Sequence, residues 1–194
     1  MAAHPQHWIT PEEYLEIERA AELKHEYYNG RIWDRAGGSY WHSLIAANFS
    51  RELGNALKGK PCAVLTSDLR ISVSPQGLYT YPDVAVVCAE PKFVDGRKDT
   101  LANPTLLVEV LSPSTEAHDR GFKSAQYRTL ASLQEYVLVA QNEARVEVFN
   151  RQSNGNWLLT EFAGLDAVAH FESVGARVPL AQIYAKVRFG EESA

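Results

Sequence analysis

The amino-acid sequence predicts a mixed fold, α/β (α+β), with a central mixed sheet flanked by helices. Apolar residues from Ser39 to Leu57 recur at helical spacing, and three apolar runs typical of strands follow. A second helical segment and a further strand come next. A helix, three antiparallel strands, a helix and a strand, in that order, form a layered core with the sheet inside.

Composition is typical of a soluble globular chain. The 194 residues are 45% hydrophobic and 22% charged, and no apolar run approaches the ~20 residues that cross a bilayer. The first residues lack the basic and apolar regions of a signal peptide, so we expect a cytoplasmic protein without membrane contact. We expect a single domain over residues 10–190, after a flexible tail at 1–9.

The net charge of −5 narrows the function classes. It disfavours a sequence-blind nucleic-acid coat protein, because such a protein carries a basic face throughout. It is compatible with an enzyme that brings a cation to a phosphate.

Two predicted elements open the domain. A short helix begins at Thr10, which can cap it and which forms a capping box with Glu13. The dipeptide Asn29-Gly30 predicts a type I′ turn between the hairpin strands Glu26–Tyr28 and Arg31–Arg35.

The other elements follow from apolar runs bounded by turn residues. A turn at residues 74–77, with proline at its second position, joins the first two strands. We expect extra N-terminal and C-terminal hairpins in addition to the core. We expect strands at Ala63–Val73, Tyr81–Cys88, Thr105–Leu111 and Glu135–Ala140, a helix over Asp119–Leu130, a hairpin of Arg145–Asn150 with Trp157–Phe162, and a last strand and short helix within Ala176–Val187.

An acidic residue interrupts the strand predicted at Thr105–Leu111. Glu109 lies within the run Leu-Leu-Val-Glu-Val-Leu, which is typical of a strand buried on both faces. An unpaired carboxylate there would cost several kcal/mol, so Glu109 needs a partner, a bound cation or a captured proton.

Strand pairing is expected to bring Glu109 close to two other acids. If residues 74–77 form a tight hairpin turn, facing residue numbers sum to about 151, which sets Asp68 opposite Asp83. Across the next loop they sum to about 193, so Asp83 neighbours Glu109 within one or two residues. Three carboxylates on one face would repel one another, and Mg²⁺ or Mn²⁺, which favours oxygen ligands, would relieve that repulsion. In the alternative, one acid pairs with Arg70 and another is protonated or exposed.

These acids belong to an ordered series of motifs. Pro82-Asp83, followed by Glu109-Val110-Leu111 on the next strand, resembles the PD-(D/E)xK nuclease signature. The wider pattern, from about Thr10 to Tyr184, is similar to the Uma-two family of restriction-endonuclease-like nucleases. That pattern is Glu26 before Asn29-Gly30, His42 in the long helix, Tyr81-Pro82-Asp83-Val84, Val108-Glu109-Val110-Leu111-Ser112-Pro113-Ser114, then Asp119, Lys123 and Tyr127, then Glu135-Tyr136.

The resemblance implies a restriction-endonuclease-like core and the activity of an Mg²⁺- or Mn²⁺-dependent phosphodiester hydrolase. It also implies a nucleic-acid substrate, and DNA is the substrate that we expect. It also implies a homodimer, for which the hairpins offer strand edges. Asp83 and Glu109, with the Val110 carbonyl, would hold the metal ion. The ion would polarise the phosphate and lower the pKa of the attacking water. Asp68 and Glu26 would be outer ligands or supports.

One position departs from the superfamily signature. The signature has a lysine two residues after the glutamate, where this sequence has Leu111. The resemblance implies that Lys123, from the following helix, supplies the ammonium instead, to orient the water or to offset developing charge. Asp119, Lys123 and Tyr127 are four residues apart and share one helical face. The alternative for Asp119 and Lys123 is a surface ion pair worth a few tenths of a kcal/mol.

Four residues are weaker candidates. A lone histidine in the first turn of a helix, as at His42, is usually a capping or surface residue. Tyr127 is expected to pack, with its hydroxyl near the site. Cys62 and Cys88 are expected to face each other across the hairpin as reduced, buried thiols.

Two rival functions stay open. A catalytically silent module could keep the nuclease fold and bind a protein or nucleic-acid partner, which Leu111 and the acidic net charge favour. The intact set of Asp83, Glu109 and Lys123 counts against it. A metal hydrolase that is not a nuclease is disfavoured, because the sequence lacks the histidine spacings of such sites.

Overall fold

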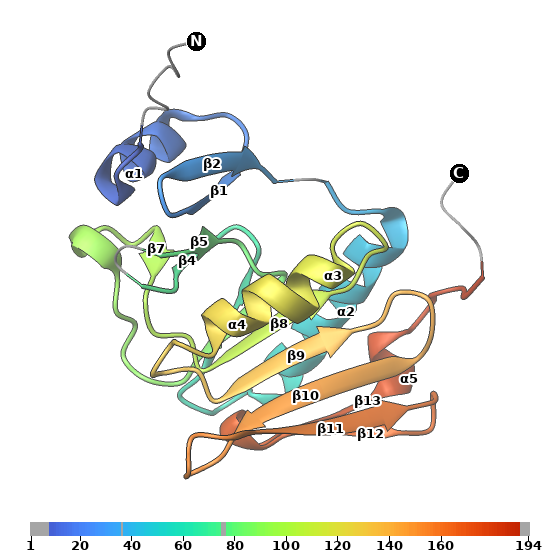
Figure 1. Cartoon of the computed structure of the whole chain (residues 1–194). Helices are drawn as coiled ribbons and strands as arrows, with labels where there is room; N and C mark the ends of the chain where they lie inside the picture. Colours follow the sequence, from blue (N-terminus) through green and yellow to red (C-terminus); the bar gives the residue numbers. More distant parts are fainter. Residues whose placement is uncertain (1–7, 36, 75–76, 191–194) are drawn as a thin grey trace.

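A six-stranded sheet forms the centre of the molecule (Figure 1). The computed structural model describes residues 8–35, 37–74 and 77–190. The strands lie in the order β11 (Trp157–Ala163), β10 (Arg145–Arg151), β9 (Glu135–Val139), β8 (Leu106–Val110), β6 (Val84–Val87) and β3 (Ala63–Thr66). β8 and β9 run parallel and the other neighbours run antiparallel, so the sheet is mixed, as predicted.

Helices cover both faces of this sheet (Figure 1). α2 (Tyr40–Ala56) buries Phe49 in one hydrophobic core with Val108 of β8. On the other face, Tyr127 from the helical segment after β8 packs in a second core with Leu107. Successive residues of a strand point to opposite faces, so Glu109 shares the face of Leu107. The predicted arrangement of a sheet between helices is confirmed.

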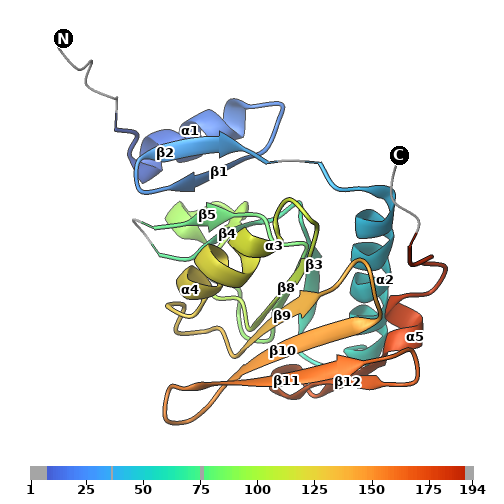
Figure 2. The ribbon, with the colours of Figure 1, turned by 45° about the vertical axis from the view of Figure 1, so that its right-hand side comes forward.

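A five-stranded sheet belongs to the N-terminal part of the fold. Its order is β2 (Arg31–Asp34), β1 (His25–Tyr28), β5 (Tyr79–Thr80), β4 (Arg70–Ser72) and β7 (Thr100–Leu101). α1 (Pro11–Ala20) packs on it through Tyr14, whose ring lies 5.0 Å from that of Tyr27. Figure 2 shows α1, β1 and β2 grouped at one end of the molecule.

The strands predicted at Ala63–Val73 and Tyr81–Cys88 are each divided between the two sheets. β3 and β6 pair in the six-stranded sheet, whereas β4 and β5 pair in the five-stranded sheet. The chain leaves regular strand at residues 67–69 and 81–83. Each long apolar run therefore contains a crossing between sheets, which periodicity alone did not reveal.

The predicted pairing across these crossings is correct to within one residue. Thr66 lies opposite Val84, and Ile71 lies opposite Thr80. The centre of the predicted turn, residues 75–76, lies outside the described residues.

The helix predicted at Asp119–Leu130 begins earlier and is not regular. It comprises α3 (Glu116–His118), a π-helical turn (Asp119–Lys123) and α4 (Ser124–Tyr127). π-helical turns widen the spacing of side chains and are often found at functional sites.

The C-terminal part contains β13 (Ala176–Pro179) and α5 (Leu180–Ile183), the predicted last strand and short helix. The partner of β13, which is β12 (Val168–Phe171), was not predicted. Short 3₁₀ turns occur at Val94–Gly96 and Glu172–Val174.

The N-terminal predictions are confirmed in detail. The Thr10 side chain accepts the Glu13 N–H at 3.2 Å, and the Glu13 carboxylate accepts the Thr10 N–H at 2.8 Å. Asn29 and Gly30 have φ of 47° and 81°, the positive values that a type I′ turn demands. Ser39 caps α2.

The expectation of two reduced cysteines is wrong. Cys62 and Cys88 do face each other across β3 and β6, but they are joined as a disulfide. Facing positions on neighbouring antiparallel strands bring the two sulfur atoms within bonding reach. The expectation of free thiols was wrong because it assumed a reducing compartment.

None of the helices within residues 8–35, 37–74 and 77–190 combines the length and the apolar composition that a membrane span requires. Of the tail expected at 1–9, residues 1–7 lie outside the described residues. Ile9 donates its N–H to the Gly30 carbonyl at 3.3 Å.

Candidate active site

A cleft of about 1660 Å³ opens beside the ends of β6 and β8. It is larger than the ~300–1,000 Å³ of most small-molecule sites. Its walls come from the β1–β2 hairpin, the first turns of α2 and the segment after β8. Apart from Asp68, every charged residue expected in the site lines it: Glu26, His42, Asp83, Glu109, Asp119 and Lys123.

Strand pairing brings Asp83 and Glu109 to the cleft together. β6 and β8 are antiparallel with Val84 opposite Val108 at the end of the ladder, and Asp83 and Glu109 are the residues that come next on the two segments. Asp83 is 7% exposed and Glu109 is 3% exposed. Two buried acidic residues therefore lie on neighbouring segments, where β6 begins and β8 ends, and both line the cleft.

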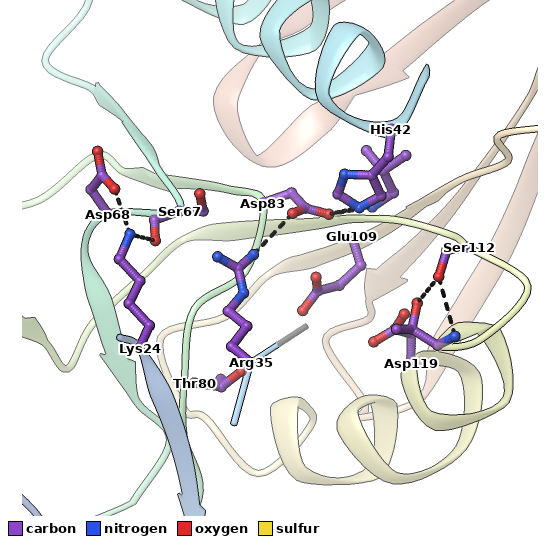
Figure 3. A network of polar contacts seen from close by, with 12 residues as sticks. Lys24, Arg35, His42, Ser67, Asp68, Thr80, Asp83, Glu109, Ser112 and Asp119 are labelled. Carbon is purple, nitrogen blue, oxygen red and sulfur yellow. Dashed lines mark hydrogen bonds and ion pairs between the residues drawn. The ribbon is translucent and has the colours of Figure 1, made fainter. Parts of the chain in front are cut away.

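Three donors hold the Asp83 carboxylate, and Figure 3 shows two of them, Arg35 and His42. Arg35 donates to Oδ1 at 3.2 Å, the Val110 N–H donates to Oδ2 at 2.8 Å, and His42 Nε2 lies 3.1 Å from Oδ2. Burial raises the pKa of Asp83, but His42, Val110 and Arg35 together outweigh it and hold that pKa below its ordinary value. Burial also opposes the charge of His42, yet Asp83 raises the His42 pKa.

Glu109 has fewer donors. Tyr127 donates its hydroxyl to Oε1 at 2.7 Å, and Lys123 donates to the same oxygen at 3.1 Å. Burial raises the pKa of Glu109 to about 8, with further upward contributions from Asp119 and Asp83 that Lys123 opposes. The Glu109 carboxyl therefore binds its proton more tightly than an ordinary glutamate does in the metal-free protein.

The Lys123 ammonium lies among three carboxylates. Its Nζ is 3.1 Å from Glu109 Oε1, 3.3 Å from Asp119 Oδ1 and 3.6 Å from Glu26 Oε1. Burial alone would lower the pKa of Lys123, but these three acids outweigh burial and raise it. Asp119 and Lys123 begin and end the π-helical turn, and both are buried. The alternative of a surface ion pair is thus wrong.

The remaining supporting residues take distinct positions. Glu26, on β1, is buried and accepts the Thr80 hydroxyl at 2.6 Å. His42 is not a surface residue, because its imidazole is largely buried and contacts Asp83. Tyr127 is fully buried with its hydroxyl on Glu109, as the packing expectation proposed.

Asp68 does not join the site, which corrects the expectation of three acids on one face. Its side chain is 87% exposed and pairs with Lys24 at 2.5 Å (Figure 3). It falls in the crossing at residues 67–69, where the strand alternation that placed it opposite Asp83 no longer holds. Arg70 does not pair with the site acids either, because it binds Thr100 and Tyr81.

Two residues that the sequence did not single out shape the site. Arg35 follows β2 and neutralises Asp83, and no spacing pointed to that contact. Gly38 lies against His42: a Cβ at Gly38 would be 2.7 Å from the imidazole Nδ1. The missing side chain therefore lets the connection into α2 pass close to His42.

The donor set fits a hard divalent cation. Carboxylate oxygens are the ligands that Mg²⁺ and Mn²⁺ prefer, and Asp83 and Glu109 offer them to one cleft. The buried Asp119 Oδ1 makes no hydrogen bond and has only the ion pair with Lys123. Within the described residues, no three His, Cys, Asp or Glu side chains are yet drawn together as a ligand set.

The sequence matches a model of the Uma2 (Uma-two) family, described as "Putative restriction endonuclease", over residues 11–181. Two proteins of Synechocystis are similar along most of their length. "Uncharacterized protein slr1290" is 38% identical over 183 residues, which are 93% of this chain and 94% of that protein. "Uncharacterized protein sll1609" is 38% identical over 163 residues, or 84% and 92% of the two chains.

A solved structure has the same fold. The crystal structure of "a putative nuclease belonging to DUF820" from Anabaena variabilis superposes with a TM-score of 0.75. It covers 93% of this chain and 99% of its own at 19% sequence identity. The nuclease fold predicted from the sequence is confirmed by this likeness.

Proposed function

The chain belongs to the Uma2 family, and we propose that it is a nuclease that hydrolyses phosphodiester bonds with the help of Mg²⁺ or Mn²⁺. The nuclease fold and the family description support the general activity. The metal and the choice of DNA as substrate are the finer parts of the proposal.

The observation that carries the proposal is the meeting of Asp83, Glu109 and Lys123 in one large cleft. These residues come from separate elements, and their burial costs free energy that packing alone does not repay. Perturbed pKa values of buried groups in a cleft are typical of sites that do chemistry.

Each residue has a role that follows from its contacts. Asp83 and Glu109, with the Val110 carbonyl, would hold the ion. When bound, the ion supplies a Lewis acid for the scissile phosphate and lowers the pKa of a water. Arg35 and His42 keep Asp83 ionised and oriented.

Lys123 and its neighbours would act on the proton and the charge. The Lys123 ammonium lies beside Glu109, where it can orient the attacking water or offset charge on the phosphate oxygens. Asp119 and Glu26 hold that ammonium in place. Tyr127 fixes the orientation of the Glu109 carboxylate.

A catalytically silent binding module is the second candidate. The observation that favours it is that Arg35, His42 and Lys123 already neutralise the buried acids, so the fold needs no metal ion. Such a module would bind its partner in EDTA and would not cut it.

We propose a homodimer as well. β11 is one of the two edge strands of the central sheet and exposes Leu158 and Leu159, which are 56% and 48% exposed. An unprotected edge of this kind pairs readily with a second chain. The cytoplasmic location stays a prediction.

The test is a cleavage assay on single-stranded and duplex DNA and RNA with Mg²⁺, Mn²⁺ or EDTA. We expect cleavage with either metal, none in EDTA, and none with the Glu109→Gln variant. Equal cleavage in EDTA would contradict the metal requirement. Binding without cleavage under all conditions would establish the silent module instead.

A further inference from the structure

The cleft contains few cations for binding phosphates. Its lining has five acids, Glu26, Asp34, Asp83, Glu109 and Asp119, against three strong bases, Arg35, Lys123 and Arg188. Arg35 is bound to Asp83, Lys123 lies among three carboxylates, and Arg188 is not free either. A duplex gripped along its backbone needs several lysines or arginines that neutralise phosphates. The described lining does not offer them.

The cleft offers aromatic rings instead. Trp33 from β2 and Trp41 from the first turn of α2 both line it, and both are partly exposed. Trp41 packs edge-on against Tyr40, with ring centroids 4.8 Å apart, and Tyr40 is 70% exposed. Aromatic rings on a cleft wall are the platforms on which unpaired bases stack, whatever their sequence.

The two tryptophans are close in sequence to the residues that hold Asp83. Trp41 directly precedes His42, and Trp33 is two residues before Arg35. His42 and Arg35 both contact the Asp83 carboxylate. Both rings line the cleft that also contains Asp83 and Glu109, so a base stacked on either ring would place its strand in the same cleft as the proposed catalytic acids.

We propose that this cleft binds single-stranded nucleic acid, with bases stacked on Trp41 and Trp33. The proposal rests on the proposed nuclease function and names its substrate class as an unpaired strand. The cleft volume, about 1660 Å³, exceeds that of sites for one small molecule and suits a polymer. Base stacking supplies the affinity that the paired cations do not.

The first measurement is binding in EDTA, where cleavage does not interfere. Fluorescence anisotropy would compare labelled oligothymidylate, oligouridylate and a self-complementary DNA hairpin of the same length. We expect both single strands to bind more tightly than the hairpin. Tighter binding of the hairpin, or no binding of either single strand, would overturn the proposal.

The second measurement uses tryptophan variants. Trp41→Ala and Trp33→Ala should each weaken oligothymidylate binding roughly 5- to 150-fold. Trp41→Phe, which keeps a flat ring, should retain most of the affinity. The matched control is Trp157→Ala, because Trp157 stacks on Arg151 at 4.6 Å and does not line the cleft. Unchanged affinity in Trp41→Ala would overturn the proposal.

Folding is checked on the same samples. Trp33 packs partly against the core, so circular dichroism must show that Trp33→Ala is folded. If it is not, Trp41→Ala against Trp41→Phe decides alone.

The outcome also separates this inference from the proposed function. Cleavage confined to duplexes would leave the nuclease standing and remove the single-strand preference. Single-strand binding without cleavage in Mn²⁺ would support the single-strand site and contradict the nuclease activity.

Discussion

Two buried glutamates on neighbouring parallel strands have opposite surroundings. Glu135 begins β9, is fully buried and accepts from Asn150 Nδ2 at 2.5 Å, the Glu172 N–H at 2.7 Å and Ser173 Oγ at 2.5 Å. Glu109 lies near the end of β8, and its two donors both approach a single oxygen, Oε1. Only Glu109 lines the cleft.

The difference separates structural burial from functional burial. Burial raises the pKa of both carboxyls, so burial alone marks neither as a site. Donors occupy both oxygens of Glu135, so it stabilises the turn after β12 and has little capacity for a ligand. Glu109 keeps a carboxylate oxygen toward an open cleft and can still accept a cation.

The largest effect should be on turnover. Glu109→Gln should abolish cleavage, because it removes one of the two negative charges that would hold the cation. Glu135→Gln, the matched control, should keep the turnover of its folded fraction. The measurement is a cleavage rate per folded molecule in Mn²⁺. Similar losses in both variants would mean that the two glutamates do not differ as we describe.

Lys123→Ala should have the next largest effect. We expect a loss of ~10²–10³-fold in cleavage rate, which is typical for the removal of one preorganised charge stabiliser. Metal affinity should change little, because the ammonium is not a ligand. Single-turnover kinetics and Mn²⁺ titration separate the two quantities. Full activity in Lys123→Ala would remove Lys123 from the site.

The free energy of unfolding should respond in the opposite order, with a larger loss for a change at Glu135 than for a change at Glu109. Glu135→Leu leaves three donors without an acceptor and should cost roughly 1–3 kcal/mol in the free energy of unfolding. Glu109→Gln should cost little in EDTA, because it removes a crowded acid and can still accept from Tyr127. Denaturant unfolding of both variants, compared with the wild type, checks this. A larger loss for Glu109→Gln would make Glu109 a structural partner.

The last expected effect is on the pH dependence of stability. The pKa of Glu109 is about 8 in the folded protein against an ordinary 4.5, so the folded state binds more protons between these values. The contribution is full below pH 4.5 and is lost as pH rises through 8, at no more than ~1.4 kcal/mol per pH unit. Glu109→Gln should remove this slope from the metal-free protein. An equal slope in wild type and variant would contradict it.

Much of the fold follows from local sequence signals. Thr10 and Glu13 form their capping box, and the Asn29-Gly30 turn forms, because both depend on residues close in the chain. Val84 pairs with Val108 as the loop arithmetic predicted, to within one residue, and this places Asp83 beside Glu109. Hairpin register depends on little more than the position of the turn.

The errors occur where the chain changes sheet or where distant segments meet. Asp68 was misplaced because the crossing at residues 67–69 breaks strand alternation. Arg35 was missed because its contact with Asp83 joins segments 48 residues apart, which no periodicity records. The π-helical turn that carries Lys123 adds an irregularity that helical spacing cannot predict.

The most direct test of the central claim is Mn²⁺ binding by the metal-free protein, measured by calorimetry and by thermal unfolding. We predict saturable binding to the wild type and to Glu135→Gln, and none to Glu109→Gln. At 100 times the dissociation constant, the bound ion should add ~2.7 kcal/mol to the free energy of unfolding. A wild-type melting temperature indifferent to millimolar Mg²⁺ and Mn²⁺, or equal binding by Glu109→Gln, would contradict the account.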